Sequence, residues 1–207
     1  ITVEIPEPEM VNAKPQDIPV NILYEDDWLA VIDKPQGMVV HPAPGHKENT
    51  LVNALMHKFK DSLSDINGVL RPGIVHRIDK DTSGLILIVK KNDAHAKIAE
   101  SIQKHQVKRT YRALVLGIIK EESGTINLPI GRNPGNRLKN AVIKTGKSAV
   151  THFKVLNRFY NSNISYLEIY LETGRTHQIR VHFSHLNHPI LGDPLYGGIK
   201  RNIKTSG

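Results

Sequence analysis

One stretch of the 207-residue chain combines carboxylates, cations and a turn directly before an apolar run. Residues 71–84 place Asp79 and Asp81 among basic and imidazole side chains, and Ser83-Gly84 leads into the apolar residues 85–89. Loops held by rigid strands often carry catalytic groups. Neighbouring cations lower the pKa of a carboxyl group by about 1–3 units. Asp79 would then be ionised at neutral pH and able to act as nucleophile or base. A surface loop with ordinary ion pairs explains these residues equally well.

Apolar patterning predicts the elements that must position this stretch. Apolar residues at 51, 52, 55, 56 and 59 have helical spacing, whereas Leu167, Ile169 and Leu171 alternate with polar residues as in a half-buried strand. The sum is a mixed α/β fold of the α+β kind, with a largely antiparallel sheet and flanking helices rather than a βαβ ladder. We expect strands over residues 28–33, 84–89, 111–116, 148–156 and 165–172, and helices over 49–59, 92–103 and 176–185.

Composition excludes several classes of protein. The absence of cysteine excludes disulfide scaffolds, zinc ribbons and thiol enzymes, and it fits a reducing compartment. Even the apolar run at residues 85–89, which no other run exceeds in length, is far too short to span a membrane. No signal peptide opens the sequence. We therefore expect a cytoplasmic protein that does not bind a membrane, and a monomer by default.

Four histidines, at positions 177, 182, 185 and 188, lie within twelve residues and could in principle bind a metal. The HExxH motif is absent and no carboxylate falls inside this stretch. Polar packing and RNA contact are simpler explanations, so we expect no metal site.

Positive charge is concentrated in the long body of the chain. The formal net charge is +8, but residues 1–40 hold 2 basic and 8 acidic residues, whereas residues 41–207 hold 26 basic and 12 acidic residues. Residues 123–167 contain seven Lys and Arg residues and no acidic residue. This imbalance predicts a polyanionic partner, nucleic acid before a membrane. The alternative is a solvated charged face.

Five sequence blocks, taken together, are more specific than any single motif. His76-Arg77-Ile78-Asp79 followed by Thr82-Ser83-Gly84 matches the pattern H-R-L-D-x-x-T-S-G, with Ile78 in place of Leu. The other patterns are K-P-x-G-x-x-V-H-P, K-x-Y-x-A-x-V-x-G, G-R-T-H-Q-I-R-x-H and H-P-I-x-G-D-x-x-Y-G, at residues 34–42, 108–117, 174–182 and 188–197. In this order they resemble the pseudouridine synthases of the RluA/RluD type.

The resemblance implies the pseudouridine synthase fold, with a central active-site cleft, and an isomerase activity. Enzymes of this family convert uridine in RNA to pseudouridine without metal or organic cofactor. The N1–C1′ bond breaks, the uracil rotates, and C5 joins C1′. Asp79 would be the catalytic carboxylate, Tyr111 would stack on the base and help to take the C5 proton, and Arg180 would pair with Asp79. The residues alone also allow Tyr111 to be a sheet-packing aromatic and Arg180 to be a phosphate contact.

RNA contacts follow from the same resemblance. A uridine in folded RNA must leave its stack to reach a pocket. By resemblance and by length, Arg77 would fill the vacated gap, because its guanidinium plane can stack on bases. A phosphate contact or an ion pair with Asp81 would explain Arg77 equally well. The other basic and imidazole side chains that we expect to bind RNA are His76, Lys80, Arg132, Lys139, Lys147, Arg175 and His177.

The domain organisation is predicted from the proline-rich start of the chain. Residues 1–20 carry four prolines among acidic residues, which is typical of an extended linker. RluD-type members usually carry an S4-like RNA-binding domain before the catalytic domain, so the resemblance implies a linker at 1–20 and a catalytic domain at 21–207 that lacks its C-terminal end. The linker and the stretch K-P-x-G-x-x-V-H-P-A-P-G favour large-subunit ribosomal RNA, and transfer RNA is the alternative.

Two other functions fit parts of the sequence. Asp79 and Asp81, about 7 Å apart in an extended segment, would suit an RNA N-glycosidase or other hydrolase that needs room for a water. Asp81→Asn would abolish that activity but spare an isomerase. The chain could also be a non-catalytic RNA-binding module or ribosome assembly factor, although such a module needs no carboxylate facing RNA phosphates.

Overall fold

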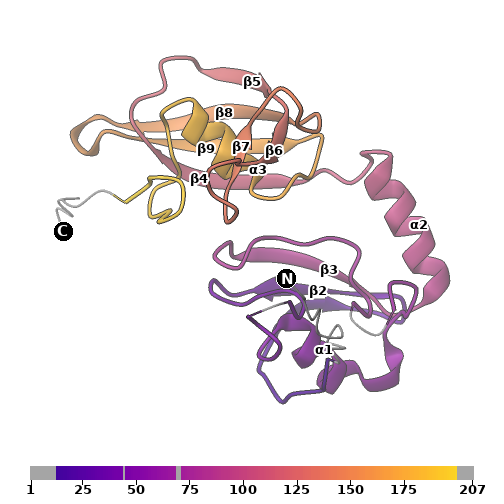
Figure 1. Ribbon diagram of the computed structural model, residues 1–207. Coiled ribbons are helices and arrows are strands. Elements are labelled where there is room, and N and C mark those ends of the chain that lie inside the picture. Colours follow the sequence, from indigo (N-terminus) through magenta and orange to yellow (C-terminus); the bar gives the residue numbers. More distant parts are fainter. Residues whose placement is uncertain (1–12, 44, 69–70, 200–207) are drawn as a thin grey trace, which may run out of the picture. The chain divides into compact units, whose positions relative to one another are not determined.

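The structure, a computed structural model, describes residues 13–43, 45–68 and 71–199. The backbone forms two compact units, Ile1–Gln106 (unit 1) and Val107–Gly207 (unit 2) (Figure 1). Both units combine antiparallel strands with helices, which confirms the predicted α+β class and the largely antiparallel pairing. No helix in the described ranges is long and apolar enough to cross a membrane.

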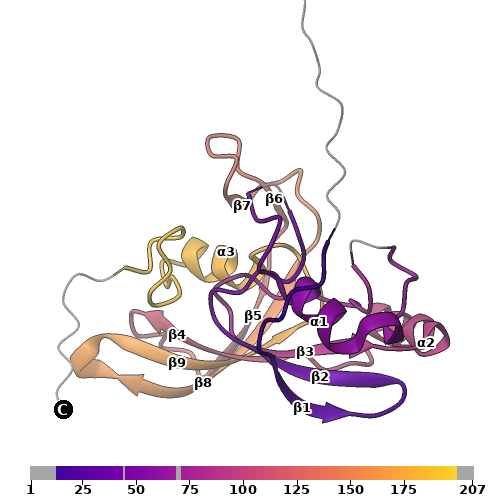
Figure 2. The ribbon, with the colours of Figure 1, turned by 90° about the horizontal axis from the view of Figure 1, so that it is seen from below.

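Unit 1 is a three-stranded antiparallel sheet with two α-helices and a 3₁₀ helix. Its elements are β1 (Asn21–Glu25), β2 (Leu29–Lys34), α1 (Leu51–Phe59), η1 (Lys60–Ser62), β3 (Gly84–Val89) and α2 (Asn92–Gln103). The strand order is β1-β2-β3, and α1 lies on one face of the sheet (Figures 1 and 2). Along β2, Ala30, Ile32 and Lys34 are buried and the residues between them are half-buried, because successive side chains point to opposite faces.

Helix α1 begins at Leu51 because Thr50 caps it. The Thr50 hydroxyl accepts a hydrogen bond from the Asn53 N–H (3.4 Å), and the Asn53 amide oxygen accepts one from the Thr50 N–H (3.0 Å). This reciprocal capping box satisfies two donors at the start of the helix. The predicted start at residue 49 is wrong by two residues, since Asn49 has a left-handed φ of 58°.

Unit 2 contains a four-stranded antiparallel sheet, a two-stranded hairpin and helix α3. Its elements are β4 (Thr110–Leu116), β5 (Ser123–Asn127), β6 (Ile130–Arg132), β7 (Asn140–Val142), β8 (Val150–Phe159), η2 (Tyr160–Ser162), β9 (Ile164–Leu171) and α3 (Gln178–His185). The large sheet has the order β4-β9-β8-β5, and β6 pairs with β7. Figure 2 shows α3 on one face of the large sheet. Val115, Leu167 and Ile169 of the sheet and Phe183 of α3 belong to one buried cluster.

Every strand and helix predicted from the sequence is present, and the ends differ by at most three residues. Four strands were not predicted, namely β1, β5, β6 and β7. The strands β6 and β7 have three residues each, too few to show an alternating pattern. Strand β5 contains Ser, Gly and Asn, which are weak strand formers. Helix α3 starts two residues late because His177 has a left-handed φ of 58°.

The end of the predicted linker contacts α1. Residues 1–12 lie outside the described part of the chain, and residues 13–20 have neither helical nor strand structure. The Asn53 side chain donates to the Lys14 carbonyl (2.8 Å), and the Gln16 N–H donates to the Asn53 carbonyl (3.0 Å). The division into a linker at 1–20 and a catalytic domain at 21–207 stays a prediction.

Candidate active site

Asp79 lies in unit 1, on a loop of residues 75–83 that we call the Asp79 loop. The loop follows Ile74, which forms an isolated antiparallel bridge to β3, and it ends where β3 begins. Ile78 is buried, and the Thr82 N–H donates to the Asp79 carbonyl (3.2 Å) to close a turn. The Asp79 side chain is half-buried. β3 therefore holds both ends of the loop, as the sequence predicted for a strand-held functional segment.

The Lys34 side chain clamps this loop to the turn after β2. Lys34 is fully buried (0 % exposed). Its ammonium group donates to the carbonyls of Pro35 (2.8 Å), Met38 (2.9 Å) and Lys80 (3.0 Å). The Gly37 N–H also donates to the Lys80 carbonyl (2.9 Å). Lys34 thus fixes the backbone of the residue that follows Asp79.

Lys34 is a site residue to which the sequence analysis gave no role. Burial lowers the pKa of its ammonium group, and the nearby charges of Asp81 and Asp79 oppose this shift. The negative charges of the loop therefore help to keep the buried Lys34 ammonium group protonated. The sequence hinted at a role for Lys34 only by its position, at the end of an apolar strand and directly before Pro-x-Gly.

A contact between the side chains of His41 and Arg77 is a further feature of the candidate site in unit 1. Arg77 Nη1 lies 3.4 Å from His41 Nε2, and the His41 residue is only 8 % exposed. Burial lowers the pKa of His41 to about 4, and the positive charges of Arg77 and Arg71 add to the effect. A neutral imidazole can accept from a guanidinium without repelling it. His41 therefore orients Arg77, whose own side chain is exposed.

The two other predicted RNA contacts on the Asp79 loop differ in their surroundings. His76 is half-buried, and its Nε2 accepts a hydrogen bond from the Leu87 N–H of β3 (2.9 Å). At least one ring nitrogen of His76 is therefore used in a hydrogen bond that holds the loop to β3. Lys80 is exposed, with its carbonyl bound to Lys34, so its ammonium group can reach a phosphate.

Tyr111 lies in unit 2, on β4, opposite Ile169 of β9. It is half-buried and packs against the buried cluster of the large sheet. Next to it, Arg112 forms an ion pair with Glu168 (2.5 Å). Packing against the sheet fixes the position of the ring, which is what a stacking platform for a base needs. The same contact also fits the simpler role of a sheet-packing aromatic.

Arg180 also lies in unit 2, on α3, and makes a two-pronged ion pair with Asp193. Arg180 Nε and Nη2 donate to the two carboxylate oxygens at 2.7 and 3.0 Å. The guanidinium carbon lies 4.9 Å from the centre of the Tyr196 ring. A bidentate pair and a stacked ring hold a guanidinium in one orientation. The predicted pairing of Arg180 with Asp79 would join the two units, and it stays a prediction.

Asp193 is a second site residue that the sequence analysis missed, since it was assigned only to a turn. Its side chain is 4 % exposed. Burial alone would raise the pKa of its carboxyl group, but the hydrogen bond and the charge of Arg180 outweigh burial. The N–H groups of Tyr196 and Leu195 lower the pKa further, so the value lies below the usual range. Asp193 is thus a firmly ionised anchor for Arg180.

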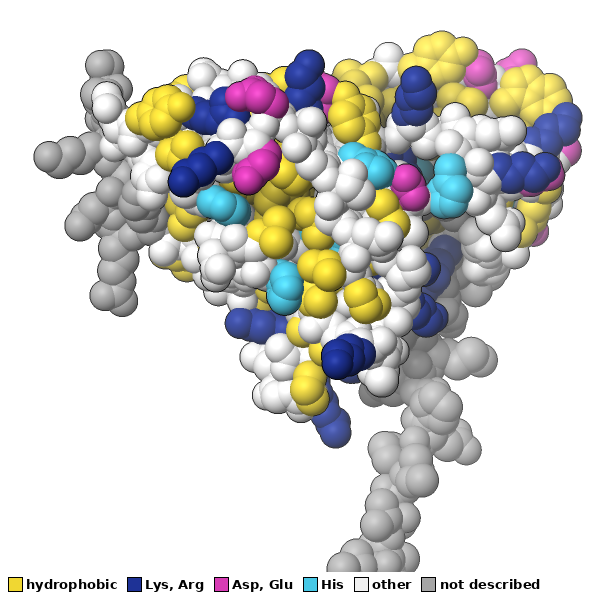
Figure 3. Space-filling model, turned by 90° about the horizontal axis from the view of Figure 1, so that it is seen from above, with side chains coloured by type: hydrophobic (Ala, Val, Ile, Leu, Met, Phe, Trp, Pro, Cys, Tyr) yellow, Lys and Arg dark blue, Asp and Glu magenta, His cyan; other side chains and the backbone are white. Residues whose placement is uncertain are grey.

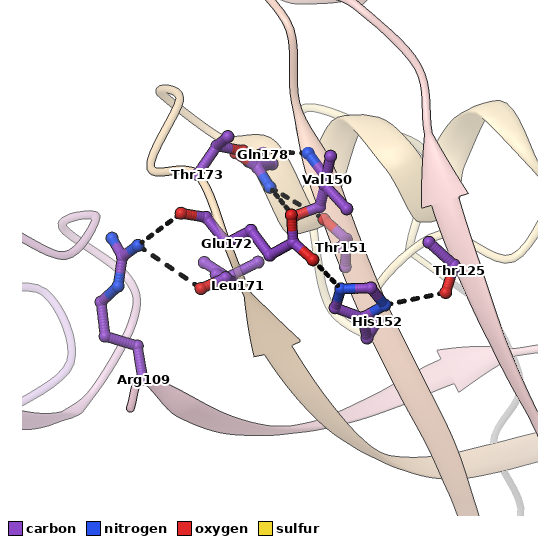
Figure 4. A network of polar contacts seen from close by, with 9 residues as sticks. All are labelled: Arg109, Thr125, Val150, Thr151, His152, Leu171, Glu172, Thr173 and Gln178. Atoms are coloured by element: carbon purple, nitrogen blue, oxygen red, sulfur yellow. Dashed lines mark hydrogen bonds and ion pairs between the residues drawn. The ribbon is translucent and has the colours of Figure 1, made fainter. Parts of the chain in front are cut away.

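A polar network around Gln178 fixes the start of α3 (Figure 4). Gln178 is 3 % exposed, and its amide donates to the Val150 carbonyl and to the Thr151 hydroxyl, both at 2.9 Å. Its amide oxygen accepts from the Thr173 hydroxyl (2.8 Å) and the Arg175 N–H (3.0 Å). Since Gln178 is two residues before Arg180, β8 sets the position of the guanidinium as well.

The preceding segment is held by further contacts in the same view. Arg109 donates to the carbonyls of Leu171 (3.4 Å) and Glu172 (3.2 Å), and Glu172 pairs with His152 (2.7 Å) (Figure 4). The exposed Arg175 donates from Nε to the Ser148 carbonyl (2.9 Å). His177 Nδ1 lies 2.8 Å from the Tyr196 hydroxyl. Arg175 and His177, both predicted RNA contacts, therefore lie in the segment that leads directly into α3.

The predicted RNA contacts of the hairpin lie on or beside β6 and β7. Arg132 and Lys147 are exposed. Lys139 is half-buried, with its ammonium nitrogen 5.9 Å from the centre of the Tyr196 ring. Their role as phosphate contacts stays a prediction.

The clustered histidines serve the packing of unit 2. His182 contacts the Thr151 hydroxyl (2.9 Å) and the Leu128 carbonyl (3.0 Å), so both of its ring nitrogens are used. His188 Nδ1 lies 2.8 Å from the Leu116 carbonyl. Across residues 13–43, 45–68 and 71–199, no three His, Cys, Asp or Glu side chains lie together as metal ligands would.

Comparison with known proteins gives the family. The family model described as RNA pseudouridylate synthase matches residues 28–185. An uncharacterized RNA pseudouridine synthase of Aquifex aeolicus is 48% identical over 197 residues, which are 95% of this chain and 62% of that protein. A ribosomal large subunit pseudouridine synthase D of Zymomonas mobilis is 49% identical over 202 residues, which are 97% of this chain and 63% of that protein. The chain thus spans less than two thirds of these relatives.

Solved structures agree with this assignment. Human RNA pseudouridylate synthase domain containing 1 aligns with a TM-score of 0.70 at 26% identity, over 92% of this chain and 72% of its own. Human RNA pseudouridylate synthase domain containing 4 aligns with a TM-score of 0.65 at 26% identity, over 87% of this chain and 70% of its own. Both similarities confirm the predicted fold. From sequence kinship and shared fold together, the chain belongs to the RNA pseudouridylate synthase family and is of the RluA/RluD type.

Proposed function

We propose that this chain isomerises uridine to pseudouridine in RNA, with large-subunit ribosomal RNA as its substrate. The family match over residues 28–185 carries the proposal. Relatives from Zymomonas mobilis and Pseudomonas aeruginosa, 49% and 51% identical, are named ribosomal large subunit pseudouridine synthase D. A cytoplasmic location and a monomeric state go with this proposal as predictions.

The proposed reaction is balanced without a cofactor. The N1–C1′ bond of uridine breaks, the uracil turns, and a C5–C1′ bond forms. C5 loses its proton and N1 gains one, so product and substrate are isomers. The protein must therefore supply a carboxylate at the ribose, a surface for the rotating base and a route for one proton.

Asp79 is the residue to which we assign the carboxylate, acting as nucleophile or base. The clamp from Lys34 to the Lys80 carbonyl supports this role, because it fixes the backbone beside Asp79 before the substrate arrives (3.0 Å). A reacting group held in place avoids the entropy cost of being ordered during the reaction.

We assign two further roles. Tyr111 would contact the uracil base, and Arg180 would pair with the charged carboxylate of Asp79. Tyr111 would stack on the extruded uracil and assist proton removal from C5. Arg180 would pair with the Asp79 carboxylate, and Asp193 would orient its guanidinium group for this contact. Arg77, oriented by His41, would occupy the place of the flipped uridine in the RNA stack. The remaining predicted RNA contacts would bind phosphates.

The test is release of tritium from C5-tritiated uridine in unmodified large-subunit ribosomal RNA fragments. Isomerisation expels the C5 hydrogen, whereas hydrolysis of the glycosidic bond and simple binding do not. We expect release by the wild type and none by Asp79→Asn. Asp81→Asn, two residues away and exposed, is the matched control and should keep the activity.

Other outcomes would replace the proposal. Loss of activity in both Asp variants, together with free uracil as product, would indicate a hydrolase with paired carboxylates. Release from transfer RNA but not from ribosomal RNA fragments would correct the substrate. RNA binding without release from either RNA, unchanged in Asp79→Asn, would favour a non-catalytic module.

A further inference from the structure

The loop that joins β6 and β7 presents a large apolar side chain to solvent. Leu138 is 78% exposed, more than any other large hydrophobic residue in the described ranges. The loop projects from the body of unit 2 (Figure 2). Single exposed apolar residues are common on protein surfaces. The setting of Leu138, rather than its exposure alone, is what indicates a contact.

The loop is organised by its own hydrogen bonds. The Asn133 side-chain oxygen accepts from the N–H groups of Gly135 (2.8 Å) and Asn136 (3.0 Å). The Asn136 side-chain oxygen accepts from the Leu138 N–H (3.0 Å). Two backbone bonds close the loop, from Asn133 to the Lys139 carbonyl and from Lys139 to the Asn136 carbonyl, both at 3.0 Å. Leu138 is therefore held outward by a closed structure, which lowers the entropy cost of binding.

The base of the hairpin is anchored to the α3 region. The Asn140 N–H donates to the Tyr196 hydroxyl (2.9 Å), and the Asn140 side chain donates to the Thr176 carbonyl (3.0 Å). A cavity of about 250 Å³ lies beside this anchor, lined by Asn133, Lys139, His185 and Tyr196 among others. Tyr196 also stacks on Arg180. The hairpin is thus coupled through one aromatic ring to a residue that we assign to the reaction.

Basic residues flank Leu138 in the sequence, and no acidic residue lies in the surrounding stretch. Arg137 is exposed next to it, and residues 123–167 contain no acidic residue. The face drawn in Figure 3 shows Lys and Arg side chains beside hydrophobic ones at its lower projecting end. An apolar side chain beside cations, in a stretch without acidic residues, suits a ligand that combines phosphate groups with the exposed faces of aromatic bases. Unpaired RNA nucleotides have this chemistry.

We propose that Leu138 makes an apolar contact with the face of an unstacked base in the RNA substrate, while Arg137 and the other hairpin cations hold the adjoining phosphates. The inference rests on the proposed RNA substrate and adds a contact of defined chemistry outside the Asp79 loop. Apolar side chains wedge against bases in other nucleic-acid complexes. A protein partner is an outcome of the test.

The experiment measures binding of the full chain to fluorescein-labelled RNA across a salt series. The probes are an in vitro transcribed ribosomal RNA fragment with unpaired loops and a fully paired RNA duplex. Leu138→Ala should weaken binding to the looped fragment about tenfold and leave duplex binding unchanged. It should not alter the salt dependence, because it removes no charge. Arg137→Gln should weaken binding to both RNAs and reduce the salt slope by about one.

Two matched variants sharpen the result. Leu23→Ala removes another exposed leucine (56%), which lies on β1 beside acidic residues, and should change neither affinity. Leu138→Phe keeps an apolar face and should retain or improve binding. Unchanged thermal unfolding of Leu138→Ala would exclude a folding defect.

Several outcomes would overturn the inference. It fails if Leu138→Ala binds the looped fragment as the wild type does, or loses duplex binding to the same degree. It also fails if the substitution changes only association with a protein. Tritium release keeps the two proposals apart. If the wild type releases tritium but Leu138→Ala binds RNA normally, only this inference is refuted. If Leu138→Ala weakens binding but no tritium is released, only the proposed isomerase activity is refuted.

Discussion

Unit 1 and unit 2 each hold a long basic side chain in the candidate site, but the positive charge of that side chain is stabilised in different ways. Lys34 in unit 1 is fully buried and donates to three neutral carbonyls. Arg180 in unit 2 is 19% exposed and pairs with one ionised carboxylate, Asp193. The first arrangement fixes a backbone, whereas the second fixes the plane of a guanidinium.

The difference indicates what each unit has to position. A carboxylate on a loop needs its backbone held, and an ammonium group with three donors can join separate carbonyls. A cation that must face a substrate or another carboxylate needs a fixed orientation, which a bidentate pair provides. The following substitutions would break or sharpen this comparison.

The largest effect is expected from Asp193→Ala. It leaves a mostly buried guanidinium without its carboxylate, and breaking such a pair from one side costs about 3 kcal/mol of unfolding free energy. Urea unfolding followed by far-UV circular dichroism at pH 7.5 measures this loss. Tritium release should fall as well, because Arg180 loses its orientation.

Asp193→Asn is the matched control, since it keeps the shape and part of the hydrogen bonding. The folded-state pKa of Asp193 lies below the usual carboxyl value, so its contribution to stability is present above that value and is lost as the pH falls. Asp193→Asn should therefore be less sensitive to acid than the wild type. Equal stability of Asp193→Ala and wild type at pH 7.5 would refute the anchor role.

Lys34→Met should have the next largest effect. The substitution keeps the length of the side chain but leaves three carbonyls without this donor, while it also removes the cost of burying a charge. We expect a net loss of about 2 kcal/mol. Trp28, the only tryptophan, lies in unit 1 and reports its unfolding by fluorescence.

The clamp also predicts a kinetic result for Lys34→Met. Loosening the Asp79 loop should lower kcat for tritium release more than it raises KM, because RNA phosphate contacts are untouched. A variant with wild-type kcat would show that the buried lysine serves only stability.

His41 should make the stability of unit 1 depend on pH. Its folded-state pKa is about 4, against the ordinary value of 6.5. Between these values the unfolded chain takes up a proton that the folded chain does not, so stability falls as the pH falls. We expect His41 to account for roughly 1–2 kcal/mol of loss between pH 7.5 and 5.0.

Urea unfolding of the wild type and His41→Asn at both pH values measures this contribution. The variant should lose less stability on acidification than the wild type does. A parallel loss in both proteins would mean that other groups, such as the buried His95, account for the pH dependence.

Local patterns made much of the fold predictable from the sequence. The helix at residues 92–103 and the strand at 84–89 were predicted with the observed bounds, because each has a clear apolar period. The burial of Lys34 was not predictable, since lysine is rarely buried and its carbonyl partners come from two separate segments. The same holds for His41, whose low pKa arises from burial and from cations 30 and more residues away.

The site residues were assigned from family motifs, and their roles stay predictions, whereas their contacts were not predictable. The sequence blocks placed Asp79, Tyr111 and Arg180 by resemblance, but the Arg180 partner in unit 2 is Asp193, which the pattern marked only as part of a turn. Pairing of side chains depends on tertiary packing, and a spacing of 13 residues has no periodic signature.

The smallest effect is expected from Arg112→Gln. Arg112 pairs with Glu168 on neighbouring strands, but its side chain is 51% exposed, against 19% for Arg180. Exposed ion pairs contribute about 0–1 kcal/mol, because water and salt screen the charges. Unfolding in urea at low and high salt should therefore show a loss of at most about 0.5 kcal/mol, present mainly at low salt. If Arg112→Gln lost as much stability as Asp193→Ala, then the difference in burial would not explain the relative strengths of the Arg112–Glu168 and Arg180–Asp193 ion pairs.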